Sequence, residues 1–408
     1  MVFWHYLLPF IFFTAIVVQL AYILGIFSRL LSHNDIEPES EPESEQKTKP
    51  SVSVVVAAWN ELENLKELLP LLEAQQYPNF EIIVADDRSV DGTYDYLLFN
   101  EGGYKKVNFV RIESLPSHFT AKKYAVTMGI KKASKEIILL TDADCRPTSE
   151  FWIDTMVAQM TQSKDVVLGF SPYQFENSRL NSLIRYETFQ TAIQYLSFAL
   201  AKMPYMGIGR NLMYRRELFW VTNGFASHHG LLGGDDDLFV NEASNNENVA
   251  ICIDANAHTI SVPKKTWGDW VTQKRRHLSV GKRYKLRDKI SLGLLAASHL
   301  ICWLWFLPAF FVKPDWFEAP EWSRIPTYLL DDNNLQDFYL YNDWMRLITF
   351  VFFFWLFIRW IVLAKANKKL NSTISSWRIP YYDMLYAGYY LIFGLVTIFT
   401  NPKKIKWR

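Results

Sequence analysis

Cysteine is scarce in this chain. Cys145, Cys252 and Cys302 are the three cysteines among 408 residues, and they are far apart, with no C-x-x-C spacing. A disulfide framework needs several paired cysteines and a zinc site needs clustered ligands, so this spacing argues against both. The scarcity also fits a reducing, cytoplasmic location for the soluble part of the chain.

A large net charge is missing as well. The 43 Lys and Arg residues nearly balance the 42 Asp and Glu residues, which leaves a formal net charge of +1. Overall electrostatics therefore give no support to a nucleic-acid partner, and none is expected. Local differences in charge along the chain carry more information than the total.

Hydrophobic residues are abundant. Half of the residues are hydrophobic, 16% are aromatic and 21% are charged, which is typical of a soluble domain joined to membrane helices. Residues 6–27 form a run of 22 residues without a charge, long enough to cross a bilayer. A cleaved signal peptide is the alternative, but no basic stretch precedes the run, and the run is longer than the apolar core of a signal peptide.

Changes in composition divide the chain. Residues 37–50 hold a short acidic repeat with prolines, which is typical of a solvated linker. We expect an N-terminal transmembrane helix over 1–31, an acidic linker over 32–50, a soluble domain over 51–262, basic interfacial helices over 263–289, and a membrane region of about three hydrophobic helices over 290–408.

Charges beside the apolar runs predict the orientation. Segment 264–289 holds ten basic and two acidic residues, whereas 313–343 holds seven acidic and two basic residues. By the positive-inside rule the basic segment and the soluble domain are cytoplasmic, so we expect an integral protein of the plasma (inner) membrane. Spans over 290–312, 347–363 and 384–399 would place the basic C-terminal tail outside, and the sequence leaves open whether the last run is re-entrant or lies at the interface.

Residues 51–262 alternate between strand and helix patterns. The β-branched run 51–59 precedes a helical pattern, and EIIVADD (81–87), VNFVRIES (107–114) and EIILLTDAD (136–144) are further strands. Repeated β-α-β units predict an α/β fold with a mostly parallel, doubly wound sheet. Ligands of such sheets bind beyond the carboxyl ends of the strands, where acidic residues lie in this chain.

Two of these strands end in acids. Asp86 and Asp87 are suited to hydrogen bonding with a ribose or a base edge, although their segment, DDRSVDGT, also reads as a capping turn without a ligand. Asp142 and Asp144 stand one residue apart after another buried strand. Carboxylates in that arrangement can direct oxygens at one hard cation, Mg2+ or Mn2+, which keeps substrate phosphates as further ligands.

A third acidic cluster is LLGGDDDLF at residues 231–239. The pair Gly233 and Gly234 lets the backbone approach a substrate, and one of the following acids can act as a general base toward a hydroxyl group. A helix N-terminus enriched in acids is the alternative.

In this order the segments resemble the membrane-anchored inverting glycosyltransferases of family 2, which have the Rossmann-like GT-A fold. The resemblance covers roughly residues 51–285 and rests on VVVAAWNE, DDRSVDGT, the D-x-D pair and the late acidic motif. Gly234 stands where the family usually has Glu, so Asp235 matches the base and Asp236 remains the alternative. The first motif implies donor contacts from Ala58, Asn60 and Glu61.

Two weaker matches concern the donor. AKKYAV resembles the family's Gly-Lys-x-x-Ala-Leu segment and implies that Lys122 contacts the nucleotide or its phosphate. A lysine on a helix surface is the alternative. GIGRNLMYRRELF resembles the segment near the donor sugar and acceptor, so Arg210 and Asn211 would hold hydroxyls or phosphate.

The last match is QKRRH, which resembles Gln-x-x-Arg-Trp with His277 in place of Trp. On a helix Gln273, Arg276 and His277 share one face. The resemblance implies that Arg276 pairs with the diphosphate and that Gln273 meets the acceptor or the nucleotide. A basic stripe against anionic lipid headgroups is the alternative.

The resemblance implies a metal-dependent transfer, with inversion, of a hexosyl or N-acetylhexosaminyl group from a nucleotide-diphosphate sugar. Asp142 and Asp144 would carry the cation, and Asp235 would deprotonate the acceptor. The basic helix beside the membrane favours a lipid or lipid-linked saccharide acceptor in the cell envelope. The alternatives are a processive polysaccharide synthase of the same family, which the Trp-to-His change puts in doubt, and an inactive nucleotide-binding membrane scaffold.

Overall fold

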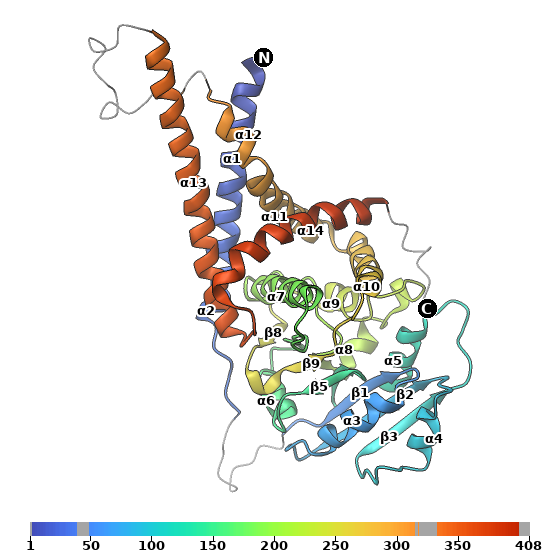
Figure 1. Ribbon diagram of the computed structural model, residues 1–408. Helices are drawn as coiled ribbons and strands as arrows, with labels where there is room; N and C mark the ends of the chain where they lie inside the picture. Colours follow the sequence, from blue (N-terminus) through green and yellow to red (C-terminus); the bar gives the residue numbers. More distant parts are fainter. Residues whose placement is uncertain (1, 39–48, 315–316, 318–332, 400–408) are drawn as a thin grey trace.

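The computed structural model of the chain describes residues 2–38, 49–314, 317 and 333–399 (Figure 1). Most of the predicted acidic linker, much of the acidic segment 313–343 and the basic C-terminal tail lie outside the described residues. Within the described part, an α/β unit forms one end of the molecule and long helices extend from it (Figure 1).

The centre of the α/β unit is a sheet with the strand order β3-β2-β1-β4-β7-β6-β8 among the described residues. Its strands are β1 (Val52–Ala58), β2 (Phe80–Asp87), β3 (Val107–Ile112), β4 (Ile137–Asp142), β6 (Val166–Gly169), β7 (Leu212–Arg215) and β8 (Val249–Cys252). Neighbouring strands pair in parallel, except that β7 is antiparallel to both β4 and β6. The mostly parallel sheet expected from the sequence is confirmed.

Helices cover both faces of this sheet. On one face lie α3 (Leu62–Glu73), α4 (Thr93–Leu98) and α6 (Trp152–Ala158), and on the other lie α5 (Ala121–Lys132) and α7 (Arg179–Leu200). Side chains of a strand alternate between the faces, so Val54 and Val56 pack with α3 while Val55 packs with α5 and α7. Burial on both faces explains the continuous apolar run of β1 and confirms double winding.

A short second sheet carries the chain away from β4. β5 (Cys145–Pro147) pairs antiparallel with β9 (Thr259–Ser261), and Cys145 is directly opposite Ser261. This pairing fixes the turn Ala143–Asp144 between two strands. It also brings the segment after β9, which leads into α10 (Trp267–Val280), beside the end of β4.

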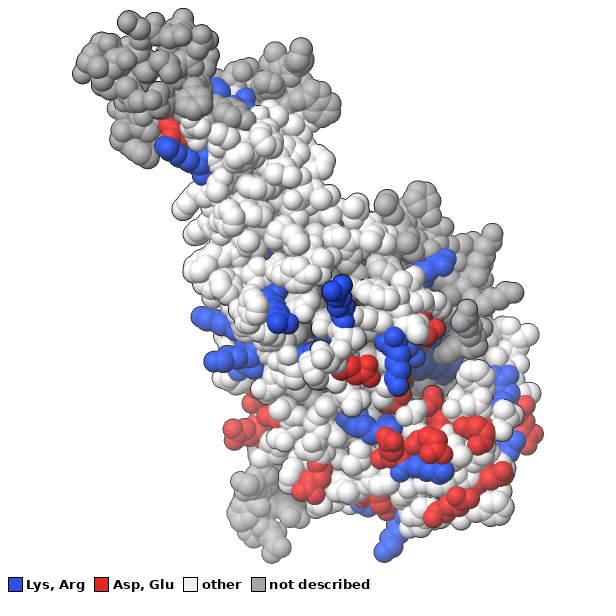
Figure 2. Space-filling view, in the orientation of Figure 1, with Lys and Arg blue, Asp and Glu red and all other residues white. Residues whose placement is uncertain are grey.

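Two described helices are long and apolar enough to cross a membrane, Tyr6–Ser32 and Asn342–Lys369. The first comprises α1 (Val2–Tyr22), a π-helical turn (Ile23–Phe27) and α2 (Ser28–Ser32), and the second is the main part of α13 (Asn333–Lys369). They contain the predicted spans 6–27 and 347–363. The run 290–312 is divided between α11 (Leu286–Leu304) and α12 (Phe306–Phe311). Figure 2 shows an uncharged surface over much of this helical end.

The last apolar run forms α14 (Ile379–Phe399), which lies crosswise to α1 and α13 (Figure 1). Its large exposed side chains, among the positions whose burial is described, are Tyr381, Met384, Leu385, Leu391 and Ile392. Its other face packs on α7, α10 and α11. Such a helix suits the plane of a membrane interface, one of the two arrangements that the sequence left open.

Candidate active site

The acids that end β2 and β4 share one edge of the sheet. In the parallel register, Asp86 lies opposite Ala58 of β1, and Asp142 lies opposite the adjacent Ala57. Two strand spacings, about 10 Å, therefore separate the ends of β2 and β4. Asp87 follows on β2 opposite Ile112 of β3. Parallel pairing thus gathers the predicted nucleoside and metal-binding acids at one end of the sheet.

Asp142 and Asp144 present oxygens to the same space. One ligand atom of each, together with the thiol of Cys145, lies within 4.8 Å of the others. Burial and the charge of Asp142 raise the pKa of Asp144, and burial raises that of the Cys145 thiol, which therefore stays protonated. Two carboxylates without a thiolate suit Mg2+ or Mn2+ better than a soft metal. The donor set accordingly fits the cation that the sequence predicts.

Glu61 adds a third carboxylate to this group. Burial raises its pKa, Asn64 opposes the shift with a 2.6 Å hydrogen bond to Oε2, and the charges of Asp144 and Asp142 raise it further. Lys264, from the segment after β9, lowers the pKa of both Glu61 and Asp144. Carboxylates that raise one another's pKa in this way are those whose mutual repulsion a divalent cation would relieve.

Lys122 joins the D-x-D pair to the late acidic motif. From the first turn of α5, its Nζ lies 3.0 Å from Oδ1 of Asp142 and 3.1 Å from Oδ2 of Asp235. Burial opposes the charge, but the two carboxylates outweigh it and raise the pKa of the Lys122 ammonium. Segments that are far apart in sequence therefore converge on one ammonium group.

The late acidic motif turns sharply before α9 (Asp237–Ala243). Gly233 and Gly234 have φ angles of 90° and 82°, in the region that favours glycine. A Cβ on Gly234 would also lie 2.8 Å from the side chain of Leu238. The backbone here explains why a glycine occupies the position where the resembled family has Glu. The turn presents Asp235 toward Lys122.

The three consecutive acids have different surroundings. Asp236 caps α9: its Oδ2 accepts a 2.7 Å hydrogen bond from the Gly209 N–H, and its Oδ1 accepts one of 2.8 Å from the Asp237 N–H. Asp237 accepts from the Tyr284 hydroxyl at 2.9 Å. Burial and neighbouring charge raise the pKa of both. In contrast, Lys122 overcomes burial and lowers the pKa of Asp235.

Lys123 anchors the same loop from beneath. Its fully buried ammonium donates to the carbonyl oxygens of His228, at 2.6 Å, and Leu231, at 3.0 Å. Burial lowers its pKa to about 8. Sequence reasoning did not identify Lys123, because the doublet in AKKYAV gives no sign of which lysine faces the loop and which faces the acids.

The loops after β1 and β2 hold each other. Asn60 donates its N–H to Ser89 at 2.8 Å, and its side-chain oxygen accepts from the Val90 N–H at 2.8 Å. Asn60 and Arg88 both have positive φ, 55° and 58°, a conformation that non-glycine residues adopt rarely and often near binding sites. The motifs VVVAAWNE and DDRSVDGT therefore form one joined surface.

The two acids of β2 differ in their partners. Asp87 pairs with the Arg88 guanidinium through both oxygens, at 2.8 and 3.2 Å. Asp86 is fully buried; its Oδ1 accepts from the Ser89 N–H at 3.3 Å, and its Oδ2 has no hydrogen-bond partner among the described residues. Asp86 therefore has one carboxylate oxygen left for a ligand or a proton.

Arg210 and Asn211 face different environments. Arg210 lies over the ring of Tyr173 at 4.3 Å and donates to the Ser171 carbonyl at 3.0 Å. Asn211 is fully buried, and its amide bonds to the carbonyls of Phe170 and Ala257 and to the indole N–H of Trp152. These hydrogen bonds tie the Asn211 amide into the fold beside Arg210, whereas the sequence predicts a substrate contact for it.

Helix α10 brings the QKRRH segment to the acidic loop. A Cβ on Gly233 would lie 3.8 Å from the side chain of Arg276, and Gln273 donates to the Tyr173 hydroxyl at 3.3 Å. His277 is exposed, but surrounding protein atoms still lower its pKa. The positive charges of Arg276 and Lys274 lower this pKa further. The positive charges of Arg210 and Lys122 also lower the pKa of His277.

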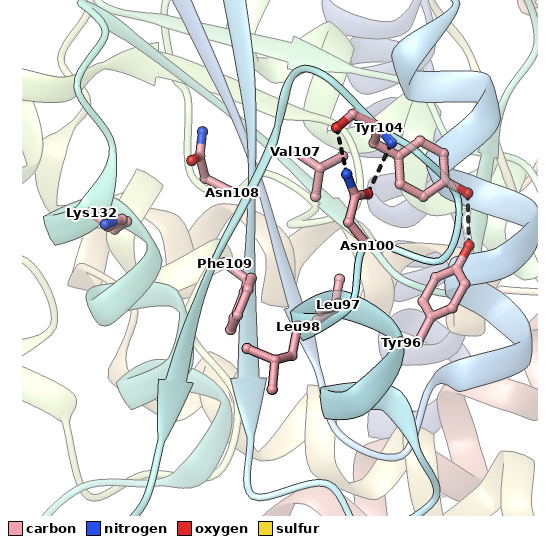
Figure 3. A pocket seen from close by; sticks show the side chains of 9 residues that line it. All are labelled: Tyr96, Leu97, Leu98, Asn100, Tyr104, Val107, Asn108, Phe109 and Lys132. Carbon is pink, nitrogen blue, oxygen red and sulfur yellow. Dashed lines mark hydrogen bonds between the residues drawn. The ribbon is translucent and has the colours of Figure 1, made fainter.

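A separate cavity of about 270 Å3 lies near the amino end of β3 (Figure 3). The hydroxyls of Tyr96 and Tyr104 meet there at 2.7 Å, and Lys132 is its charged lining residue. The acids of the candidate site lie at the carboxyl ends of the strands. This cavity therefore lies at the other end of the sheet, away from those acids. The described residues that line it include no carboxylate.

Comparisons with known proteins agree with this architecture. Residues 53–222 match the family described as Glycosyl transferase family 2. Glycosyltransferase AglE of Haloferax volcanii is 24% identical over 285 residues, which cover 68% of this chain and 86% of that protein. Dolichol-phosphate mannosyltransferase of Pyrococcus furiosus is 31% identical over 121 residues, 29% of this chain and 32% of that protein.

A solved structure gives the fold. The mannosyltransferase PcManGT from Pyrobaculum calidifontis, in complex with GDP-Man and Mn2+, superimposes with a TM-score of 0.54 and 19% identity. The match covers 90% of this chain and 99% of that structure. The mostly parallel sheet and its helices therefore form a GT-A fold.

Proposed function

We propose that this glycosyltransferase, whose residues 53–222 match family 2, transfers a sugar, with inversion, from a nucleotide-diphosphate donor to a lipid or lipid-linked saccharide. One observation carries this assignment. Asp142, after β4, and Asp235, before α9, meet at the ammonium of Lys122, at 3.0 and 3.1 Å. The carboxylate suited to the metal on a leaving diphosphate and the carboxylate suited to an acceptor hydroxyl are therefore close together in one site.

Asp142 and Asp144 would hold Mg2+ or Mn2+. When bound, the cation supplies positive charge that stabilises a departing diphosphate. The Mn2+ in the PcManGT complex supports this choice. Arg210 and Lys264 supply further positive charge near Asp144, and the carboxylate of Glu61 adds negative charge to the group.

Asp235 is the proposed general base, in preference to Asp236. Both oxygens of Asp236 accept backbone hydrogen bonds, so this carboxylate is committed to the N-terminus of α9. Asp235 pairs with the Lys122 ammonium, and the lowered pKa of Asp235 keeps it ionised at neutral pH. An ionised carboxylate within reach of the acceptor hydroxyl can take its proton as the oxygen attacks the anomeric carbon.

The nucleoside would bind on the joined loops after β1 and β2. Ala58 and Asp86 are register partners at the floor of this surface, and Asn60 ties the two loops together. The free oxygen of Asp86 and the Arg88-held carboxylate of Asp87 are the groups suited to a base or ribose edge. Gln273, against Tyr173, would border the sugar.

The acceptor is proposed to arrive from a membrane. Figure 2 shows Lys and Arg gathered where the uncharged helical end meets the α/β unit. Exposed basic residues at the ends of α2, α11 and α13 include Arg29, Arg287, Lys289, Lys365 and Lys368. This distribution supports anchoring at an anionic cytoplasmic surface of the inner membrane. Dolichol phosphate, in the name of one relative, is an acceptor of this chemical class.

A donor and acceptor screen tests the function. The full chain in lipid nanodiscs is incubated with nucleotide sugars and polyprenyl phosphates or diphosphate-linked saccharides, and products are weighed by mass spectrometry. One added sugar per acceptor is the expected product. A ladder of lengths would instead identify a polysaccharide synthase, and the absence of turnover with every donor would identify a nucleotide-binding scaffold.

A further inference from the structure

Lys122 occupies a position between two groups with different proposed tasks. Its ammonium contacts Oδ1 of Asp142, a proposed metal ligand, and Oδ2 of Asp235, the proposed base. The exposed side-chain fractions are 31% for Lys122 and 34% for Asp142, but 9% for Asp235. A small ion or a phosphate can therefore approach the Lys122–Asp142 pair from solvent, while the Asp235 end is enclosed.

The ammonium and a divalent cation compete for the same carboxylate, that of Asp142. A carboxylate oxygen bonded to an ammonium at 3.0 Å has less negative charge to offer a metal. A dication at Asp142 would also be repelled by a positive charge only a few ångströms away. The donor-free arrangement is thus unfavourable for metal binding, although Asp142 and Asp144 have suitable geometry.

We propose that Lys122 is a placeholder cation that yields its position when the donor binds. In the donor-free protein its ammonium holds Asp142 and Asp235 together, weakens divalent-cation binding and keeps the base paired. The diphosphate of the donor draws the ammonium away, which opens Asp142 to the cation and leaves Asp235 for the acceptor hydroxyl. This inference rests on the proposed function, because it assigns a sequence of events to the same site.

The side chain is suited to this exchange. A lysine carries its charge on a flexible four-carbon stem, so it can change partners without moving the backbone. Lys122 stands in the first turn of the 12-residue helix α5, whose positive end also favours an arriving anion. When the ammonium moves to the phosphate oxygens, the dication takes its place beside Asp142, so that carboxylate keeps a positive partner while Asp235 becomes unpaired. Donor and metal then bind cooperatively, each strengthening the other.

Mn2+ alone is the probe that tests the inference without turnover. Free and bound Mn2+ are separated by electron paramagnetic resonance in titrations of the full chain in nanodiscs, without nucleotide. Lys122→Met should bind Mn2+ about tenfold more tightly than the wild type, because the competing charge is gone. Lys122→Gln is measured alongside, and thermal unfolding verifies that both variants fold. Lys122→Arg, which keeps the charge, and Lys131→Met, at an exposed position of the same helix, should bind as the wild type does.

A second titration, with saturating UDP or GDP, tests the exchange itself. The nucleotide should tighten Mn2+ binding to the wild type by a larger factor than to Lys122→Met, which has no ammonium to remove. A merely structural ion pair would not produce this difference. Equal factors in the two proteins would overturn the exchange.

Asp144→Asn separates this inference from the proposed function. If Asp144→Asn loses Mn2+ binding while Lys122→Met and Lys122→Gln bind no more tightly than the wild type, the placeholder role is wrong and the metal site stands. If Asp144→Asn binds Mn2+ as tightly as the wild type, the metal assignment in the proposed function is wrong. If both Lys122 variants bind Mn2+ more tightly than the wild type, and adding Asp144→Asn removes this binding, the result supports both the placeholder role and the metal assignment.

Discussion

The carboxylate of Asp236 accepts a 2.7 Å hydrogen bond from the backbone N–H of Gly209. Its other oxygen accepts from the first N–H of α9, so both oxygens have structural partners. The close approach of the two segments requires a small residue, since a Cβ on Gly209 would lie 3.3 Å from the Asp236 side chain. The adjacent Asp235 points instead to the ammonium of Lys122.

Two neighbouring substitutions should therefore behave differently. Asp235→Asn removes the general base and should lower kcat about a thousandfold, with little change in donor affinity. Asp236→Asn keeps one acceptor oxygen, so it should cost about 1 kcal/mol of stability through the weakened cap and lower kcat far less. Steady-state kinetics and donor titration measure both effects. The reverse order of the two kcat losses would assign the base to Asp236.

The pH dependence of transfer should respond to Lys122. The ammonium lowers the pKa of Asp235 against the effect of burial, so the base stays ionised until the pH falls below the usual range of aspartate. Lys122→Met removes the largest influence that opposes burial and so raises that pKa. The acid limb of the kcat/KM profile for the donor, which reports the donor-free protein, should therefore shift to higher pH in Lys122→Met. An unshifted limb, at saturating cation, would show that the ionisation of Asp235 in the donor-free protein does not limit the rate at low pH.

Lys123 should affect stability in the alkaline range. Its pKa is about 8 in the folded chain against an ordinary value of 10.5, so the unfolded chain binds more protons between these values. Stability from this group therefore rises as pH increases through that window. Lys123→Met should unfold at lower temperature because two carbonyls lose their donor, and it should lack this rise. Thermal unfolding at several pH values measures the difference, with Lys131→Met as the exposed control.

The helices of the apolar end meet at a buried ion pair. Arg359 of α13 donates to both oxygens of Asp383 of α14, each at 2.8 Å, and Tyr186 of α7 adds a 3.0 Å hydrogen bond. Arg359→Leu alone leaves a buried carboxylate without its counter-charge and should cost about 3–5 kcal/mol. Adding Asp383→Leu should restore much of the loss. Unfolding in detergent tests this, and a double variant no better than the single one would contradict the pairing.

The sequence predicted the edge of the sheet that carries the acids, because the strand runs and their acidic ends are local signals. Parallel pairing then placed Asp86 and Asp142 near one another without further information. The reversed direction of β7 was not predictable in this way. Its four residues, Leu212–Arg215, carry no local sign of the antiparallel pairing with β4.

Side-chain roles were harder to predict than strands. A polar pair such as Arg210 and Asn211 looks alike in sequence, yet burial turns the Asn211 amide into a structural link among three distant segments. The roles of the two lysines in α5 are equally hard to predict from sequence. Only the packing of the 226–236 loop decides which ammonium bonds to its carbonyls and which pairs with Asp235. The crosswise position of α14 likewise depends on its contacts with α7 and α10.

The most direct test is whether the D-x-D pair holds a cation on the donor diphosphate. Mn2+ and a nucleoside diphosphate are bound to the full chain, and electron-nuclear double resonance records the 31P coupling to the metal. A strong coupling from a directly bound phosphate is expected in the wild type and should disappear in Asp144→Asn. An unchanged coupling in Asp144→Asn, or a protein-bound Mn2+ without phosphorus in its coordination sphere, would contradict a metal bridge at this edge of the sheet.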